Sequence, residues 1–254
     1  MIEENKPSLD DKVECPVCHS PLKVLDYKYI KMLDKYFPIT EECEFCKLQE
    51  KISKKLNLRK SLEKANVGSR YLDLEFSQLE NTSKSFITAK ETTINYCKAL
   101  GTCKKRGLGL YVFGDNGRGK TALVACMLRE IANQGYSMYL TNLTEVTDKL
   151  FKNEIKLSFL KKVDFLVIDD IGSERMFKSG NDETFIADKA NEIIASREKD
   201  LKPTLFTSNL SISSLFKVGY TKKTVERIAS LSTKVLEIQT SESFRLRTQK
   251  ELPF

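Results

Sequence analysis

The chain has 254 residues, enough for one large domain and a small accessory module. Hydrophobic residues make up 41% and charged residues 30% of the sequence, a composition that excludes disordered and fibrous proteins. No run approaches the roughly 18 consecutive apolar residues of a membrane span, so we expect no membrane partner. The net charge of +7 permits polyanion binding but falls well short of a histone-like composition. Residues 1–6 lack the basic start and apolar run of a secretory signal, so we expect a cytoplasmic protein.

Four of the seven cysteines form two Cys-x-x-Cys pairs, Cys15 with Cys18 and Cys43 with Cys46. Each pair can direct two thiolates at one ion, and together they satisfy the tetrahedral geometry that zinc accepts. Four protein ligands leave no open position for water, so the metal would be structural. The sequence therefore predicts a zinc-binding module over residues 1–48 that depends on Zn²⁺ for folding energy.

Two features of this module leave alternatives open. The interval between the pairs, His19 to Glu42, has 24 residues and exceeds the usual length of about 15–20. The pairs could thus be unrelated, one of them redox-active. His19, the only histidine, could replace a thiolate, although an exposed position in the turn is the simpler expectation. The other three cysteines are expected to be small buried apolar residues: Cys97, Cys103 and Cys126.

Residues 49–64 are rich in charge, with Ile52, Leu56 and Leu62 at roughly helical spacing. We expect a solvated linker helix here, joining the cysteine module to a larger domain over residues 65–254.

That larger domain contains a glycine-rich octet between an apolar run over 108–113 and a helical pattern over 121–132. This is the strand–loop–helix context of a P-loop, in which backbone N–H groups surround phosphate oxygens. The lysine of the motif reaches the β and γ phosphates, and the following hydroxyl ligates Mg²⁺. We therefore predict an ATP and Mg²⁺ site built from the octet: Gly114, Asp115, Asn116, Gly117, Arg118, Gly119, Lys120 and Thr121.

A second motif is the continuous apolar stretch over 164–168 that ends in Asp169 and Asp170. Such a stretch is typical of a central parallel strand buried on both faces, and ligands bind beyond the carboxyl ends of these strands. We expect Asp169 to hold Mg²⁺ through water and Asp170 to orient the attacking water as the base. A turn or helix-cap role for the two carboxylates is the alternative.

Further strand-like segments, 136–140, 204–209 and 235–238, alternate with helical stretches. This alternation predicts the α/β class, with a five-stranded parallel sheet flanked by helices on both faces.

The order of three strings within residues 65–254 resembles the AAA+ ATPases of the DnaC/DnaI helicase-loader and IstB group. The strings are Gly-Asp-Asn-Gly-Arg-Gly-Lys-Thr, Leu-Val-Ile-Asp-Asp-Ile-Gly-Ser-Glu and Leu-Phe-Thr-Ser-Asn-Leu. The resemblance implies that Asn209 is sensor 1 and that Arg227 is an arginine finger offered to a neighbouring subunit. It also implies that Arg245 is sensor 2, with Arg247 as a nearly equal competitor. Surface cations are the alternative for these arginines.

Two further points follow from the same resemblance. Most AAA+ proteins carry Glu where this chain has the shorter Asp170, so Glu174 is a candidate to assist the base. The segment 67–76 resembles the part that precedes the core in these loaders, which implies a wall for the adenine. Core packing of Tyr71 and Phe76 is the equal alternative.

The resemblance implies an ATP-dependent loader of a replicative helicase onto single-stranded DNA during replication initiation, with the cysteine module docking on the helicase. An arginine finger supplied in trans implies a homo-oligomer in the ATP state, with Mg²⁺-dependent ATPase activity stimulated by assembly on DNA. The alternative is an IstB-like ATPase that assists DNA transposition. A DNA-independent P-loop kinase fits the acidic pair and the arginine near the C-terminus less well.

Overall fold

A computed structural model describes residues 7–33, 35–173 and 181–239, with only the backbone described over 181–187. The chain divides into two compact units, Met1–Asn57 and Leu58–Phe254. Glu174, Arg245 and Arg247, which the resemblance assigned to the ATPase site, lie outside the described residues.

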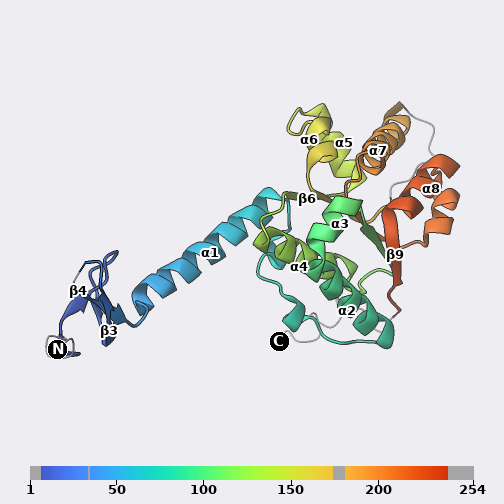
Figure 1. The fold of residues 1–254 in the computed structure, drawn as a ribbon. Coiled ribbons are helices and arrows are strands. Elements are labelled where there is room, and N and C mark those ends of the chain that lie inside the picture. Colours follow the sequence, from blue (N-terminus) through green and yellow to red (C-terminus); the bar gives the residue numbers. More distant parts are fainter. Residues whose placement is uncertain (1–6, 34, 174–180, 240–254) are drawn as a thin grey trace, which may run out of the picture. The chain divides into compact units, whose positions relative to one another are not determined.

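The first unit is built from two small antiparallel hairpins and the start of a helix (Figure 1). Strands β1 (Val13–Glu14) and β2 (Pro21–Leu22) flank the first cysteine pair, and β3 (Val24–Ile30) pairs with β4 (Lys35–Thr40). The second hairpin lies wholly between the two cysteine pairs, which explains the long interval seen in the sequence. Helix α1 (Glu44–Lys64) begins at the second pair, five residues before the expected linker helix.

The second unit contains a five-stranded sheet in the order β6-β7-β8-β5-β9, and every neighbouring pair is parallel. The predicted parallel sheet is thus confirmed. The strands are β5 (Gly109–Phe113), β6 (Met138–Thr141), β7 (Phe165–Ile168), β8 (Thr204–Ser208) and β9 (Ser232–Glu237). Strand β8 lies between β5, which leads into the P-loop, and β7, which ends at the acidic pair.

Helices cover both faces of this sheet because its strand residues alternate between two hydrophobic clusters. In β7, Phe165 and Val167 face one cluster, while Leu166 and Ile168 face the other. The first face is covered by α2 (Lys84–Lys98), α3 (Leu100–Arg106) and α4 (Lys120–Asn133). The second is covered by α5 (Leu143–Phe151), α6 (Leu157–Lys162), α7 (Asn181–Lys199), the 3-10 helix η4 (Ile212–Val218) and α8 (Lys222–Leu231). Two short 3-10 helices, η2 (Ser69–Tyr71) and η3 (Phe76–Gln78), precede α2.

The three cysteines outside the paired motifs are buried in this second unit, as expected: Cys97, Cys103 and Cys126. Burial raises the pKa of Cys126 to about 12 and raises that of Cys97 as well, so these thiols are inert packing groups. Within the part of the chain that the structure describes, no helix has the length and apolar character needed to cross a bilayer.

Candidate functional site

The glycines of the P-loop allow a backbone path that other residues would obstruct. Gly114 has a φ of 148°, and a Cβ atom at this position would lie 2.3 Å from the carbonyl oxygen of Ile238. Gly117 and Gly119 have φ values of 76° and 84°, in the left-handed region that favours glycine. The loop therefore passes close to the strand-end backbone and turns directly into α4, leaving its N–H groups at a helix N-terminus, where anions bind.

Lys120 is the first residue of α4 and is only 7% exposed. Its Nζ donates hydrogen bonds to the carbonyl oxygens of Gly114, at 2.7 Å, and Asp115, at 2.9 Å. A third bond, of 2.7 Å, reaches Oδ1 of Asn209 at the end of β8. The ammonium is thus held inside the loop by groups that it can exchange for phosphate oxygens.

Asp169 follows β7 and faces the first turn of α4. The hydroxyl of Thr121 lies 3.2 Å from both carboxylate oxygens of Asp169, and the hydroxyl of Thr207 donates to Oδ1. Burial raises the pKa of Asp169, and the hydrogen bonds from Thr207 and Thr121 oppose that rise. A carboxylate beside a P-loop hydroxyl is the oxygen-donor set that suits Mg²⁺.

Asn209 connects the second carboxylate to the P-loop lysine. Its Nδ2 donates to Oδ1 of Asp170 at 2.9 Å, while its Oδ1 accepts from Lys120. The orientation of the amide follows from its partners, because the ammonium only donates and the carboxylate only accepts. The order of the strands brings these three groups together, since β8 separates β5 from β7.

A cavity of about 690 Å³ opens over these groups, within the range of about 300–1,000 Å³ that is usual for ligand pockets. Its lining includes Lys120, Thr121 and Asp169. It also includes Arg70 and Tyr71 from the segment that precedes the core, and the Arg70 guanidinium lies 4.4 Å from the centre of the Tyr71 ring.

The two aromatic residues of that segment have different surroundings. Tyr71 lines the cavity and also packs against the core, whereas Phe76 packs against two hydrophobic clusters. Tyr71 is thus within the cavity lining, and its contact with adenine stays a prediction.

Comparison with known proteins gives this arrangement a family context. No protein-family model matches the sequence. The replicative helicase loader DnaI of Bacillus subtilis (strain 168) is 25% identical over 230 residues, which are 83% of this chain and 70% of that protein. The crystal structure of DnaI matches with a TM-score of 0.57 and 25% identity over 70% of this chain and 94% of that one. The crystal structure of the DnaC helicase loader matches with a TM-score of 0.59 and 24% identity, over 68% of this chain and 100% of that chain.

This chain has the AAA+ fold of the DnaC/DnaI-like helicase loaders. The chain shares this fold with DnaI over 70% of its length, and the P-loop stands between β5 and α4, where the sequence predicted it.

Arg227 of this AAA+ chain lies on α8 and contacts α7. Its Nη1 donates to Oδ1 of Asn191 at 2.7 Å, and its Nε lies 3.3 Å from Oε2 of Glu198. Arg227 is not among the described residues that line the cavity. This placement is compatible with the predicted role in trans.

Sequence reasoning missed Thr207, although the structure places its hydroxyl between the Asp169 carboxylate and the backbone N–H of Asp170. Its side chain is fully buried in β8. The available signal was the two consecutive hydroxyl residues, Thr207 and Ser208, at the carboxyl end of a buried strand, because a buried hydroxyl must find hydrogen-bond partners.

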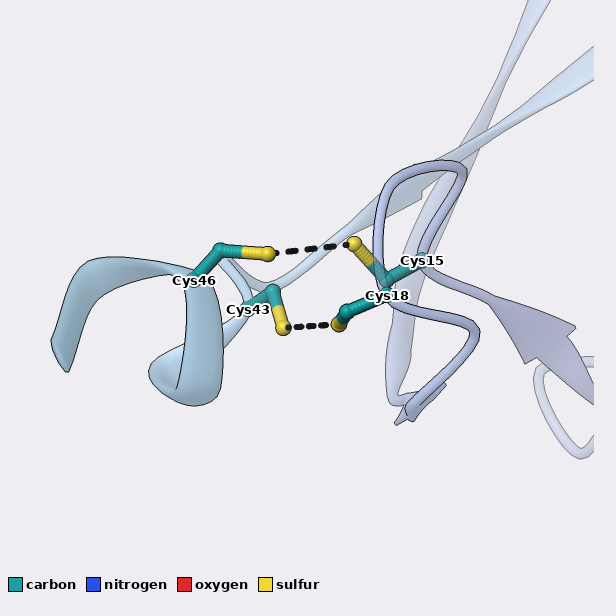
Figure 2. Close-up of side chains that lie close together, drawn as sticks. All are labelled: Cys15, Cys18, Cys43 and Cys46. Carbon is teal, nitrogen blue, oxygen red and sulfur yellow. Dashed lines mark hydrogen bonds between the residues drawn. The ribbon is translucent and has the colours of Figure 1, made fainter. Parts of the chain in front are cut away.

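The four paired cysteines form one cluster in the first unit (Figure 2). All four Sγ atoms lie within 4.8 Å of one another, with 3.7 Å between Cys15 and Cys46 and 3.4 Å between Cys18 and Cys43. A tetrahedral zinc ion with Zn–S bonds of about 2.3 Å separates its sulfurs by about 3.8 Å. The donor set therefore fits a metal ion of that size.

The electrostatics of the cluster also favour a cation. Hydrogen bonding to Ser20 lowers the pKa of Cys18 to about 6, whereas hydrogen bonds with Cys18 and Cys15 raise that of Cys46 to about 12. A positive charge between the sulfur atoms would stabilise thiolates that lie this close together. His19 is exposed and lies 3.7 Å from Glu14, outside the cluster, as the simpler expectation had it.

Proposed function

We propose that this chain is an ATP-dependent loader that places a replicative DNA helicase on single-stranded DNA during replication initiation. The observation that carries the proposal is the similarity to the helicase loader DnaI over 83% of this chain, combined with the nucleotide site at the P-loop. The fold alone would permit many activities, so the proposal depends on that combination.

The side chains at the P-loop support ATP hydrolysis in the following way. Lys120 exchanges its bonds to Gly114 and Asp115 for β and γ phosphate oxygens. Thr121 and Asp169 would hold Mg²⁺, which would supply positive charge to neutralise the phosphates. Asp170 orients the attacking water, and Asn209 fixes the direction of the Asp170 carboxylate.

We further propose that the hydrolytic site is completed between subunits. Arg227 lies away from the cavity of its own chain, as a finger acting in trans requires. A neighbouring copy that binds in the ATP state would draw Arg227 from Glu198 to its own γ phosphate. Hydrolysis would then depend on homo-oligomer formation on DNA.

Replacing Arg227 with alanine should lower DNA-stimulated ATP turnover by about 1,000-fold, the lower range for arginine fingers, without weakening ATP binding. Lys223→Ala, an exposed change on the same helix, is the matched control. Turnover and equilibrium ATP binding are measured in parallel.

Mixing the Arg227→Ala chain with a Lys120→Ala chain tests the trans arrangement directly. Neither variant alone should hydrolyse ATP, but in the mixture an intact P-loop from one chain meets an intact arginine from the other. Restored turnover in the mixture is the expected result. A wild-type rate for Arg227→Ala alone would refute the role.

For the first unit we propose a structural zinc ion held by the four clustered cysteines and a docking role on the helicase. The unit has little core of its own, with Cys15, Val24 and Tyr27 as its buried apolar residues among those described. A closed four-thiolate site would supply the missing folding energy.

Metal analysis should find about one zinc ion per purified chain, the stoichiometry of a closed four-thiolate site. Cys43→Ser should lose most of that zinc, because three thiolates no longer close the site. His19→Ala is the matched control and should retain it, since the imidazole lies outside the cluster. A zinc content near zero in wild-type protein purified without chelators would contradict the zinc proposal.

A further inference from the structure

Thr207 links the two acidic residues of the nucleotide site through one hydroxyl group. Its Oγ1 donates to Oδ1 of Asp169 and accepts the backbone N–H of Asp170 at 2.8 Å. Its carbonyl oxygen also accepts the N–H of Ile171, again at 2.8 Å. One buried residue of β8 therefore holds the side chain of Asp169 and the backbone that follows it.

The backbone at Asp170 makes these contacts consequential. Asp170 has a φ of 56°, in the left-handed region, which aspartate visits more readily than most residues but at some cost. Such a conformation persists where neighbouring groups hold it, and the Thr207 hydroxyl bonds the N–H group of this very residue. The direction of the Asp170 carboxylate depends on that backbone.

The two hydroxyl groups that donate to the Asp169 carboxylate differ in the role that we expect for them when nucleotide binds. Both Thr121 and Thr207 donate to this carboxylate in the described structure. A P-loop threonine hydroxyl would ligate Mg²⁺ through its oxygen in the loaded state, so Thr121 would serve both the ion and Asp169. The Thr207 residue lies at the cavity but is fully buried, and among the described residues its hydroxyl bonds only the acidic pair, at the Asp169 carboxylate and the Asp170 N–H.

We propose that Thr207 is a positioning residue that keeps Asp169 directed at the magnesium position and Asp170 directed at the attacking water. The inference rests on the proposed ATPase function and assigns the role to the hydroxyl group rather than to the volume of the side chain. Removing a residue that hydrogen-bonds a metal ligand typically lowers metal affinity or activity by about 10–100-fold.

The test compares Thr207→Val, which keeps the shape and removes the hydroxyl, with Thr207→Ser, which keeps the hydroxyl. The first readout is equilibrium binding of a non-hydrolysable ATP analogue at increasing Mg²⁺ concentration. Thr207→Val should raise the Mg²⁺ midpoint by about tenfold or more, and Thr207→Ser should restore it. The second readout is ATP turnover, where the valine variant should lose kcat while KM for ATP stays near the wild-type value.

Circular dichroism confirms that each variant is folded before these measurements. A folded valine variant with the wild-type Mg²⁺ midpoint would overturn the inference, as would a serine variant as impaired as the valine one. A wild-type chain without Mg²⁺-dependent nucleotide binding would overturn both this inference and the nucleotide site. Normal Mg²⁺-dependent binding without helicase loading would contradict the loader proposal alone.

Discussion

Replacing Lys120 with alanine is expected to weaken ATP binding at least about 100-fold. Each charge-assisted hydrogen bond contributes about 1.5–3 kcal/mol, so loss of two phosphate contacts removes at least about 3 kcal/mol. At about 1.4 kcal/mol per tenfold change in affinity, that is two orders of magnitude. The ammonium is already in place, since it is 7% exposed and bonded to the loop that it would leave for phosphate. Calorimetric titration with ATP and Mg²⁺ measures the change.

Two controls separate a lost contact from a lost fold. Lys98→Ala removes an exposed lysine of α2 and should bind ATP like the wild type. Thermal unfolding of the Lys120→Ala chain should remain cooperative. The groups that accepted hydrogen bonds from the lysine, such as the Asp115 carbonyl, can accept them from water in the cavity instead. Wild-type affinity in a folded Lys120→Ala chain would contradict the assignment of the P-loop as the phosphate site.

Arg197→Met is expected to destabilise the second unit by about 2–6 kcal/mol, because two buried carbonyl groups lose their donor at a cost of about 1–3 kcal/mol each. Arg197 on α7 is fully buried, and its guanidinium donates to the carbonyl oxygens of Leu160, Val163 and Pro203 at 2.8, 2.9 and 2.6 Å. Burial lowers the pKa of Arg197 to about 9, so it stays charged at neutral pH. Methionine fills similar volume but donates no hydrogen bond, so the carbonyl groups of Leu160 and Val163 lose this donor, whereas that of Pro203 keeps the N–H of Leu166.

Urea denaturation gives the free energy of unfolding for this comparison. Arg106→Met, an exposed change at the end of α3, should stay within about 0.5 kcal/mol of the wild type. The carbonyl groups that Arg197 joins stand just before β7 and β8, the strands whose other ends carry Asp169 and Asn209. An Arg197→Met chain as stable as the wild type would show that the guanidinium does not hold these strands in place.

The strands and the P-loop could be predicted because their signals are local. A continuous apolar run reads as a buried strand wherever it lies in the sheet, and the glycine pattern needs only its flanking strand and helix. The two cysteine pairs were likewise recognisable from spacing, and the structure brings their sulfurs together.

The order of strands in the sheet is a long-range property and could not be read from local pattern. It is the insertion of β8 between β5 and β7 that joins Lys120, Asn209 and Asp170, residues far apart in sequence. Thr207 was missed for the same reason, since its partners lie on the neighbouring strand. Arg197 was missed because an arginine near a helix end ordinarily reads as a solvated charge.

The most direct test of the central claim is a loading assay with the full chain, a hexameric replicative helicase and circular single-stranded DNA covered with single-strand-binding protein. Strand displacement downstream of loading is measured with and without ATP. We expect the wild-type chain to capture the helicase and start unwinding in the presence of ATP, and the Lys120→Ala chain to fail. A wild-type chain that captures no helicase and instead forms ATP-dependent filaments on duplex DNA would contradict the loader account and favour a transposition ATPase.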